Sequence, residues 1–91
     1  MTEVKWLLSR LTVEDLVALI YITRRGPYTF EQLQEICLHA DIYCDVTYLS
    51  RLGLIRKKDG RYETTKKADE LMDLIGKLLK HYGEAEAVAE G

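Results

Sequence analysis

The most constraining feature of the sequence is the stretch from Leu49 to Thr65, which reads LSRLGLIRKKDGRYETT. Gly53 can adopt the left-handed conformation that ends a helix. Asp59-Gly60 is among the strongest two-residue hairpin turns, because both central residues must accept a positive φ. Thr65 is a residue type that caps the N-terminus of a following helix. The stretch therefore predicts a helix that ends at Gly53, a hairpin over residues 54–64 and another helix.

Positively charged side chains face each other at the tip of this hairpin. With a two-residue loop Lys58 lies opposite Arg61, and with a three-residue loop Lys57 lies opposite Arg61. Two opposed cations destabilise a strand pair by about a few tenths of a kcal/mol or more. A bound phosphate would turn this repulsion into attraction. Lysines that only protect an exposed sheet edge against aggregation explain the same pattern, so both interpretations stay open on the hairpin alone.

The charge of the chain is unevenly distributed. The net charge is −2, which by itself argues weakly against a nucleic-acid partner. From residue 51 to residue 67, however, seven cations stand against two acids, so this segment carries +5 and the rest of the chain −7. Because distribution matters more than the sum, the hairpin and its flanks are candidates for a nucleic-acid contact.

Apolar spacing and capping patterns predict the remaining helices of a single domain. Thr12-Val-Glu-Asp15 resembles a capping box with Asp in place of Glu, and Thr29-Phe-Glu-Gln32 is a second capping-box pattern. Gly26-Pro27 ends the helix between them, which is apolar around most of its surface and should be central. The predicted helices span residues 1–11, 12–25, 30–40, 42–52 and 66–82, and an acidic, flexible tail covers residues 83–91.

The last predicted helix carries an apolar stripe at a 4-3 spacing, which is a heptad seam. A second apolar stripe lies beside it, so one stripe can pack on the domain and the other on a second copy of the chain. A glycine in mid-helix costs about 1 kcal/mol relative to alanine, and a close helix crossing there would explain its presence. The predicted homodimer interface consists of Ala68, Met72, Ile75, Gly76, Leu79 and Tyr82.

The sequence also resembles that of a known protein family. The residues that carry this resemblance are Leu49-x-x-Leu52-Gly53-Leu54-Ile55, the Asp59-Gly60 turn, Tyr62 and the pair Thr64-Thr65. Residues 12 to 82 resemble a winged helix-turn-helix DNA-binding domain. The match is similar to the small MarR-, PadR- and ArsR-type regulators and to the small winged-helix regulators of archaea and their viruses. The resemblance implies a mainly α fold with a small β-hairpin. It also implies a homodimeric transcriptional regulator that binds double-stranded DNA in a sequence-specific manner.

The resemblance also implies which residues contact DNA. The helix over residues 42–52 matches the recognition helix in the major groove, and the hairpin matches the wing, which meets phosphates or the minor groove. The sequence departs from this pattern at Asp41 and Asp45, because acids near phosphates repel. A winged helix that serves as a protein–protein interaction module is therefore the alternative. The implied DNA contacts are Tyr43, Thr47, Tyr48, Ser50 and Arg51 in the recognition helix, and Arg56, Lys57, Lys58 and Arg61 in the wing.

Potential metal ligands cluster between Cys37 and Cys44, with His39 and Asp41 between them. This spacing is not that of a standard zinc motif, so we predict no metal site. Cys37 falls on the apolar face of its helix, where a small core residue is the default interpretation. A disulfide between Cys37 and Cys44 that joins two helices is the alternative. The predicted helix over residues 66–82 contains His81 near its end, where a favourable charge is expected in place of a ligand.

Several classes of function are not expected from the sequence. It contains no nucleophile–base pair, no phosphate-binding glycine loop and no paired-carboxylate motif, so we predict neither enzymatic activity nor a cofactor. No apolar run reaches the roughly 20 residues that span a bilayer, and no signal-peptide pattern begins the chain. We therefore expect an intracellular, cytoplasmic protein, in the host cytoplasm if the source is viral. The absence of asparagine favours a thermophilic source. The target sequence and any small-molecule effector are not readable.

Overall fold

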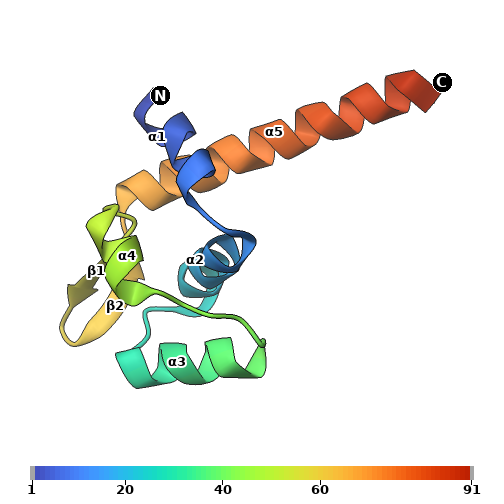
Figure 1. Ribbon diagram of the computed structural model, residues 1–91. Coiled ribbons are helices and arrows are strands. Elements are labelled where there is room, and N and C mark those ends of the chain that lie inside the picture. The colour runs from blue at the N-terminus through green and yellow to red at the C-terminus, as the bar shows by residue number, and fades with distance from the viewer. Residues whose placement is uncertain (1, 91) are drawn as a thin grey trace.

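The fold is mainly helical, with one small antiparallel hairpin between the fourth and fifth α-helices (Figure 1). The computed structural model describes the backbone of residues 2–90 and the side chains of residues 5–83. Met1 and Gly91, the ends of the predicted N-terminal helix and of the predicted tail, lie outside the described residues. In chain order the elements are α1 (Thr2–Leu7), the 3-10 turn η1 (Leu8–Arg10), α2 (Val13–Arg25), α3 (Phe30–His39), α4 (Val46–Arg51), β1 (Ile55–Lys58), β2 (Arg61–Thr64) and α5 (Lys66–Glu90).

Helix α2 begins and ends where its sequence signals place it. The Thr12 hydroxyl accepts a hydrogen bond from the Asp15 N–H at 3.2 Å, and the Asp15 carboxylate accepts one from the Thr12 N–H at 2.9 Å. The predicted capping box with aspartate is therefore confirmed, as is the second one at the start of α3. At the other end, a Cβ on Gly26 would lie 2.5 Å from the Ile22 carbonyl oxygen. Only glycine fits this helix terminus without a shift of the backbone.

The core lies between the helices and the base of the hairpin. Burial of a leucine side chain contributes about 1.5–3 kcal/mol, so a small number of them holds a chain of this size together. Helix α2 crosses the middle of the domain, with α3 below it and α1 and α5 above it in the view of Figure 1. The largest fully buried side chains are leucines from every α-helix and from the connection before β1: Leu7, Leu19, Leu33, Leu49, Leu54 and Leu71.

The connection from α4 into the hairpin is tightly specified. Gly53 has φ +78°, and its N–H donates to the Ser50 carbonyl, while the Leu54 N–H donates to the Leu49 carbonyl. These two bonds make a Schellman motif, which satisfies carbonyl groups at the end of α4. Thr65 then accepts from the Ala68 N–H at 3.4 Å and caps α5, as expected. The helix–hairpin–helix order predicted for this stretch is confirmed.

Several predicted helix boundaries are wrong. The α-helix expected over residues 1–11 ends at Leu7, where the 3-10 turn η1 follows. The helix expected over residues 42–52 begins only at Val46, because the Asp45 side chain accepts from the Tyr48 N–H and acts as an N-cap. At the C-terminus, α5 does not end at Tyr82 but continues to Glu90, in place of the flexible tail expected over residues 83–91. The residues after Gly83 are mainly alanine and glutamate, which are strong helix formers and outweigh one glycine.

Helix α5 extends well beyond the rest of the domain. Its first turns lie beside α1 and above α2, and its second half projects away from all other elements (Figure 1). The molecule is accordingly elongated, with principal extents of 50 × 29 × 20 Å. None of the helices in the described part of the chain combines the length and apolar character that a membrane crossing requires.

Candidate nucleic-acid interface

Helix α4 presents a short polar face to solvent. Thr47, Ser50 and Arg51 are all exposed, whereas Val46 and Leu49 on the opposite face are buried. Spacings of three and four residues bring the three exposed side chains together on one side of the helix. Hydroxyl and guanidinium groups can contact base edges or phosphates. The structure thus gathers three of the five residues predicted for this helix.

The other two predicted residues, Tyr43 and Tyr48, are placed differently. Tyr48 is half-buried and its hydroxyl donates to the Arg10 carbonyl oxygen at 2.6 Å, so it joins α4 to the N-terminal segment. Tyr43 is 73 % exposed but lies in the linker before α4, where its N–H donates to the Glu14 carboxylate. The prediction that Tyr43 lies on the helix is wrong, because the helix starts three residues later.

The two acids near α4 have local structural roles. Asp45 is the N-cap of α4, with its carboxylate 3.0 Å from the Tyr48 nitrogen. Asp41 adopts φ +56° in the turn after α3, a conformation that aspartate tolerates better than most residues. Both residues therefore have a reason to be present that is independent of any ligand, although their charges remain close to α4.

The hairpin has the shorter of the two loops considered. Lys58 pairs with Arg61 across the strands, and Asp59 and Gly60 both have positive φ, as a two-residue type I′ turn requires. Two residues further along, on the same face of the hairpin, Arg56 pairs with Glu63 and its Nε lies 2.7 Å from the Glu63 carboxylate. Arg56 is thus partly neutralised, which leaves Lys58 and Arg61 as the opposed cations of this face.

The base of the hairpin is anchored on the domain, and its tip is not. Tyr28 and Tyr62 form a bridge, with each N–H donating to the other residue's carbonyl oxygen at 3.1 and 2.6 Å. Lys57 lies on the same hairpin face as Tyr62, with its Nζ 5.9 Å from the centroid of the tyrosine ring. The four residues from Lys58 to Arg61 are exposed. The base of the hairpin is therefore held beside α4, and the cations at its tip are exposed to solvent.

A third group of cations surrounds Trp6, and it was not predicted from the sequence. The Arg10 guanidinium lies 5.9 Å from the Trp6 ring centroid and the Lys67 ammonium 6.0 Å from it. Trp6 and Arg10 are four residues apart, a spacing that could have signalled their contact on a helix. No local signal connects either of them to Lys67, which comes from the start of α5.

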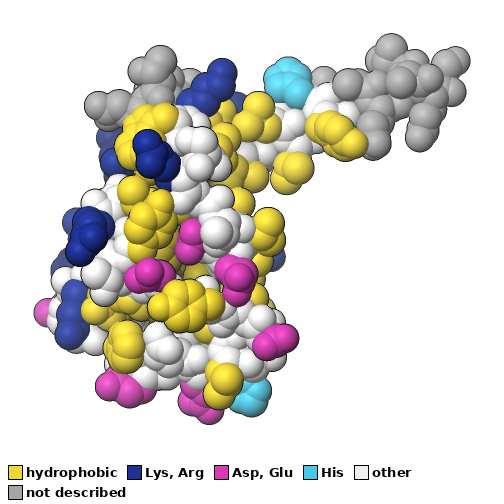
Figure 2. All heavy atoms as spheres, viewed as in Figure 1, with side chains coloured by type: hydrophobic (Ala, Val, Ile, Leu, Met, Phe, Trp, Pro, Cys, Tyr) yellow, Lys and Arg dark blue, Asp and Glu magenta, His cyan; other side chains and the backbone are white. Residues whose placement is uncertain are grey.

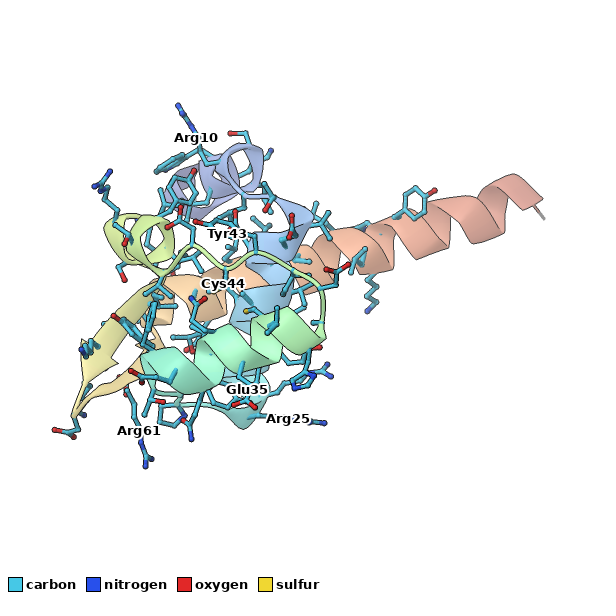
Figure 3. All side chains as sticks on the ribbon, turned by 60° about the horizontal axis from the view of Figure 1, so that its bottom comes forward. Arg10, Arg25, Glu35, Tyr43, Cys44 and Arg61 are labelled. Atoms are coloured by element: carbon cyan, nitrogen blue, oxygen red, sulfur yellow. The ribbon has the colours of Figure 1, made fainter. Side chains whose placement is uncertain are left out.

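Positive charge gathers along one side of the molecule. In Figure 2, Lys and Arg side chains line the side on which α4 and the hairpin lie in Figure 1, whereas most Asp and Glu side chains lie toward the middle and bottom. Arg10 projects from the N-terminal segment and Arg61 from the hairpin, on either side of α4 in the view of Figure 3. A basic surface adjacent to an exposed polar helix is suited to a polyanion.

The cysteine pair lies inside the domain. Cys37 and Cys44 are buried, and within the described chain both are free thiols that lie near each other. Burial, together with the neighbouring Cys37 and nearby carboxylates, raises the pKa of Cys44 to about 12. Burial also raises the pKa of Cys37. The predicted core role is confirmed, whereas the disulfide considered as an alternative is not formed in this structure.

The described side chains include no group of three or more Cys, His, Asp or Glu residues that could hold a metal ion. Cys37 and Cys44 point into the core, while His39 and Asp41 are exposed. The four residues that cluster in the sequence are therefore divided between the interior and the surface of the domain.

The exposed half of α5 carries an unpartnered apolar face. Leu79 and Tyr82 are 66 % and 64 % exposed, and Leu78 is also exposed. A groove of about 310 Å³ runs between this face and α2. Ala68, by contrast, is completely buried in the core, so its assignment to a dimer interface is wrong. The groove is lined by Ile20, Thr23, Arg24, Met72, Ile75, Gly76 and Leu79.

Comparisons of the chain with models of protein families, with curated proteins and with solved structures found no match.

Proposed function

We propose that the chain is a homodimeric winged helix-turn-helix regulator that binds double-stranded DNA in a sequence-specific manner. In this proposal α4 is the recognition helix and the β1–β2 hairpin is the wing. The observation that carries the proposal is the adjacency of the exposed face of Thr47, Ser50 and Arg51 to a hairpin whose opposed cations form no ion pair with any side chain that the structure describes.

The two parts of this surface have different tasks. Side chains on α4 enter the major groove, where Arg51 can donate two hydrogen bonds to a guanine and Thr47 can contact a thymine methyl group. Lys57, Lys58 and Arg61 neutralise phosphates or enter the minor groove, and they supply affinity that is independent of sequence. A phosphate between Lys58 and Arg61 would relieve the repulsion that the free hairpin carries.

The projecting half of α5 supplies the dimer contact. Leu79 and Tyr82 of one copy fit the groove between α2 and α5 of the other, and the two-fold axis repeats the contact. A Cβ added to Gly76 would have no atom within 4 Å, so the helix surface is open for close approach of a second helix. Two recognition helices then reach half-sites about 34–36 Å apart on a near-palindrome.

Selection of preferred duplexes from a random pool tests the proposal directly. An enriched near-palindrome would support sequence-specific binding, the dimer and the half-site spacing together. Anisotropy titration of a random duplex at about 50 and 200 mM salt measures the non-specific component, which should weaken steeply with salt. Absence of binding at the lower salt concentration would contradict the proposal.

The second candidate function is a protein–protein interaction module built on the same fold. It is favoured by a surface hollow of about 340 Å³ beside the linker before α4, with acidic and apolar walls. Leu38 and Tyr43 in this wall are 79 % and 73 % exposed. A chain that fails to bind any duplex at low salt would favour this function. The hollow is lined by Glu14, Leu38, Asp41, Ile42 and Tyr43.

A further inference from the structure

We propose that Arg10 and Lys67, held beside the Trp6 ring, form a third phosphate-binding site on the same duplex. This inference rests on the proposed DNA-binding function and adds a contact that neither the recognition helix nor the wing supplies. It extends the DNA-binding surface from α4 to the N-terminal segment. Its ligand is the phosphate backbone that flanks the bases contacted by α4.

The first support is the local chemistry of the cluster. Both cations lie about 6 Å from the centroid of one indole ring, which is 45 % exposed. A cation–π contact at an exposed site contributes about 0.5–1 kcal/mol and orders a long side chain. A guanidinium stacked on an aromatic ring keeps its N–H donors available for a phosphate. The ring therefore prepares Arg10 and Lys67 for an anion without consuming their hydrogen-bonding capacity.

The second support is the absence of a neutralising acid. Among the side chains that the structure describes, no carboxylate lies within 4.0 Å of Arg10 or Lys67, whereas Arg56 in the hairpin is paired with Glu63. Two unneutralised cations beside one ring resemble the opposed Lys58 and Arg61 at the hairpin tip. In both places an approaching phosphate would relieve repulsion between like charges.

The third support is the attachment of the cluster to α4. The Tyr48 hydroxyl donates to the Arg10 carbonyl oxygen at 2.6 Å, which ties the segment to the recognition helix. Lys67 lies beside Gly53, which directly follows α4. A Cβ on Gly53 would be 3.7 Å from the Lys67 Cδ and 3.8 Å from the Lys67 Nζ. When α4 enters a groove, the cluster is carried to the backbone beside it. Arg10 and the hairpin's Arg61 lie on either side of α4 (Figure 3).

The salt dependence of binding tests the site. Each phosphate contact contributes about 0.9 to the slope of log K against log salt. For each bound subunit, Arg10→Gln and Lys67→Gln should each lower the magnitude of the slope by about one, and the double variant by about two, so that a bound dimer shows twice these changes. Arg10→Lys keeps the charge and should retain the wild-type slope. Lys77→Gln and Lys80→Gln remove the same charge from the projecting part of α5 and should also leave the slope unchanged.

Trp6 provides an independent readout, because it is the only tryptophan in the chain. Its fluorescence should change on addition of duplex with the same midpoint as the anisotropy of the labelled duplex. An unchanged slope in the Arg10→Gln/Lys67→Gln variant, with a lowered slope in Arg61→Gln, would overturn this inference and leave the proposed function intact. Weaker binding at an unchanged slope would mark a purely structural cluster and overturn it as well. Failure of the wild-type chain to bind any duplex would overturn both proposals.

Discussion

Lys58 and Arg61 oppose each other across the hairpin, so stability and binding should respond to their charges in opposite directions. In the free protein, Arg61→Gln should raise the free energy of unfolding by about a few tenths of a kcal/mol, because it removes a repulsive pair. The same change should weaken binding to every duplex and lower the magnitude of the salt slope by about one for each bound subunit. Urea denaturation and anisotropy titration measure the two effects.

Arg56→Gln is the matched control for this prediction. It removes the same charge from the same face, but it breaks the contact with Glu63 and should give no gain in stability. If Arg61→Gln destabilises the free protein or leaves the binding affinity unchanged, the assignment of this pair to phosphate binding is wrong.

Cys44 should make the protein sensitive to alkaline pH. Its pKa is raised from 9.0 to about 12, so above pH 9 the unfolded chain binds fewer protons than the folded one. Stability contributed by the neutral thiol is complete below pH 9 and is lost as the pH rises toward 12. Between pH 8 and 10 the wild type should lose about 1 kcal/mol more than Cys44→Ala, measured by urea denaturation at both values. Equal losses would contradict the burial of this thiol.

Sequence patterns predicted individual contacts only where the partners are close in the chain. The opposed Lys58 and Arg61 follow from one turn signal, whereas the contact between Trp6 and Arg10 was not predicted, although their spacing of four residues could have signalled it. Lys67 reaches the same ring from the beginning of α5, and only the packing of α1 on α5 brings them together. Contacts of this kind depend on tertiary structure and carry no local signature.

At the scale of elements, the start of α4 depends on Asp45. Asp45→Ala removes the N-cap and should lower the free energy of unfolding by about 1 kcal/mol. Asp45→Asn preserves a good capping side chain and removes only the negative charge. It should leave stability nearly unchanged and strengthen DNA binding, because one repulsive charge near the phosphates is lost. Thermal unfolding and duplex titration of both variants separate the two roles. Weaker binding by Asp45→Asn would show instead that the carboxylate contacts a base.

The ends of the elements were harder to predict than their order. Thr12 and Thr29 mark the starts of α2 and α3 correctly, because a capping box identifies the exact residue. The sequence does not identify Asp45 as a helix start, since a lone aspartate without a reciprocal partner is a weaker signal than a box. It predicts that the last helix ends at Tyr82, before Gly83, but the alanine- and glutamate-rich residues after Gly83 continue α5.

At the scale of the whole molecule, the projecting half of α5 should control the oligomeric state. Leu79→Glu places a charge on the apolar face and should convert the proposed dimer to a monomer, as measured by light scattering. Its DNA affinity should fall as well, because two linked half-sites bind more tightly than one. Lys80→Glu introduces the same side chain at the next position and should remain dimeric. A wild-type mass of one chain would contradict the dimer and leave the groove without an occupant.

The overall architecture could be predicted from the sequence, whereas the division of the α5 stripe between core and surface could not. Helix order and the hairpin follow from periodicity and turn chemistry. The central position of α2 was also predicted, although Val13 and Ile20 on this helix are exposed. Ala68 shows the limit, because a heptad spacing does not reveal which part of a stripe is used by the core. The position along α5 at which the apolar stripe passes from the core to the surface depends on where the other elements of the domain end.

The hairpin is attached to the domain from its base up to Tyr62, and only its tip extends beyond that point. The N–H and the carbonyl oxygen of Tyr62 both hydrogen bond to Tyr28. Beyond Tyr62, only the bonds between β1 and β2 hold the tip of the hairpin. The amide proton of Tyr62, which donates to the Tyr28 carbonyl, should therefore exchange with deuterium more slowly than those of Lys58 and Arg61, as followed by NMR. Equal rates along the hairpin would contradict this picture. Because the tip of the hairpin can move while its base stays in place, Lys58 and Arg61 can contact grooves of different width without disturbing the core.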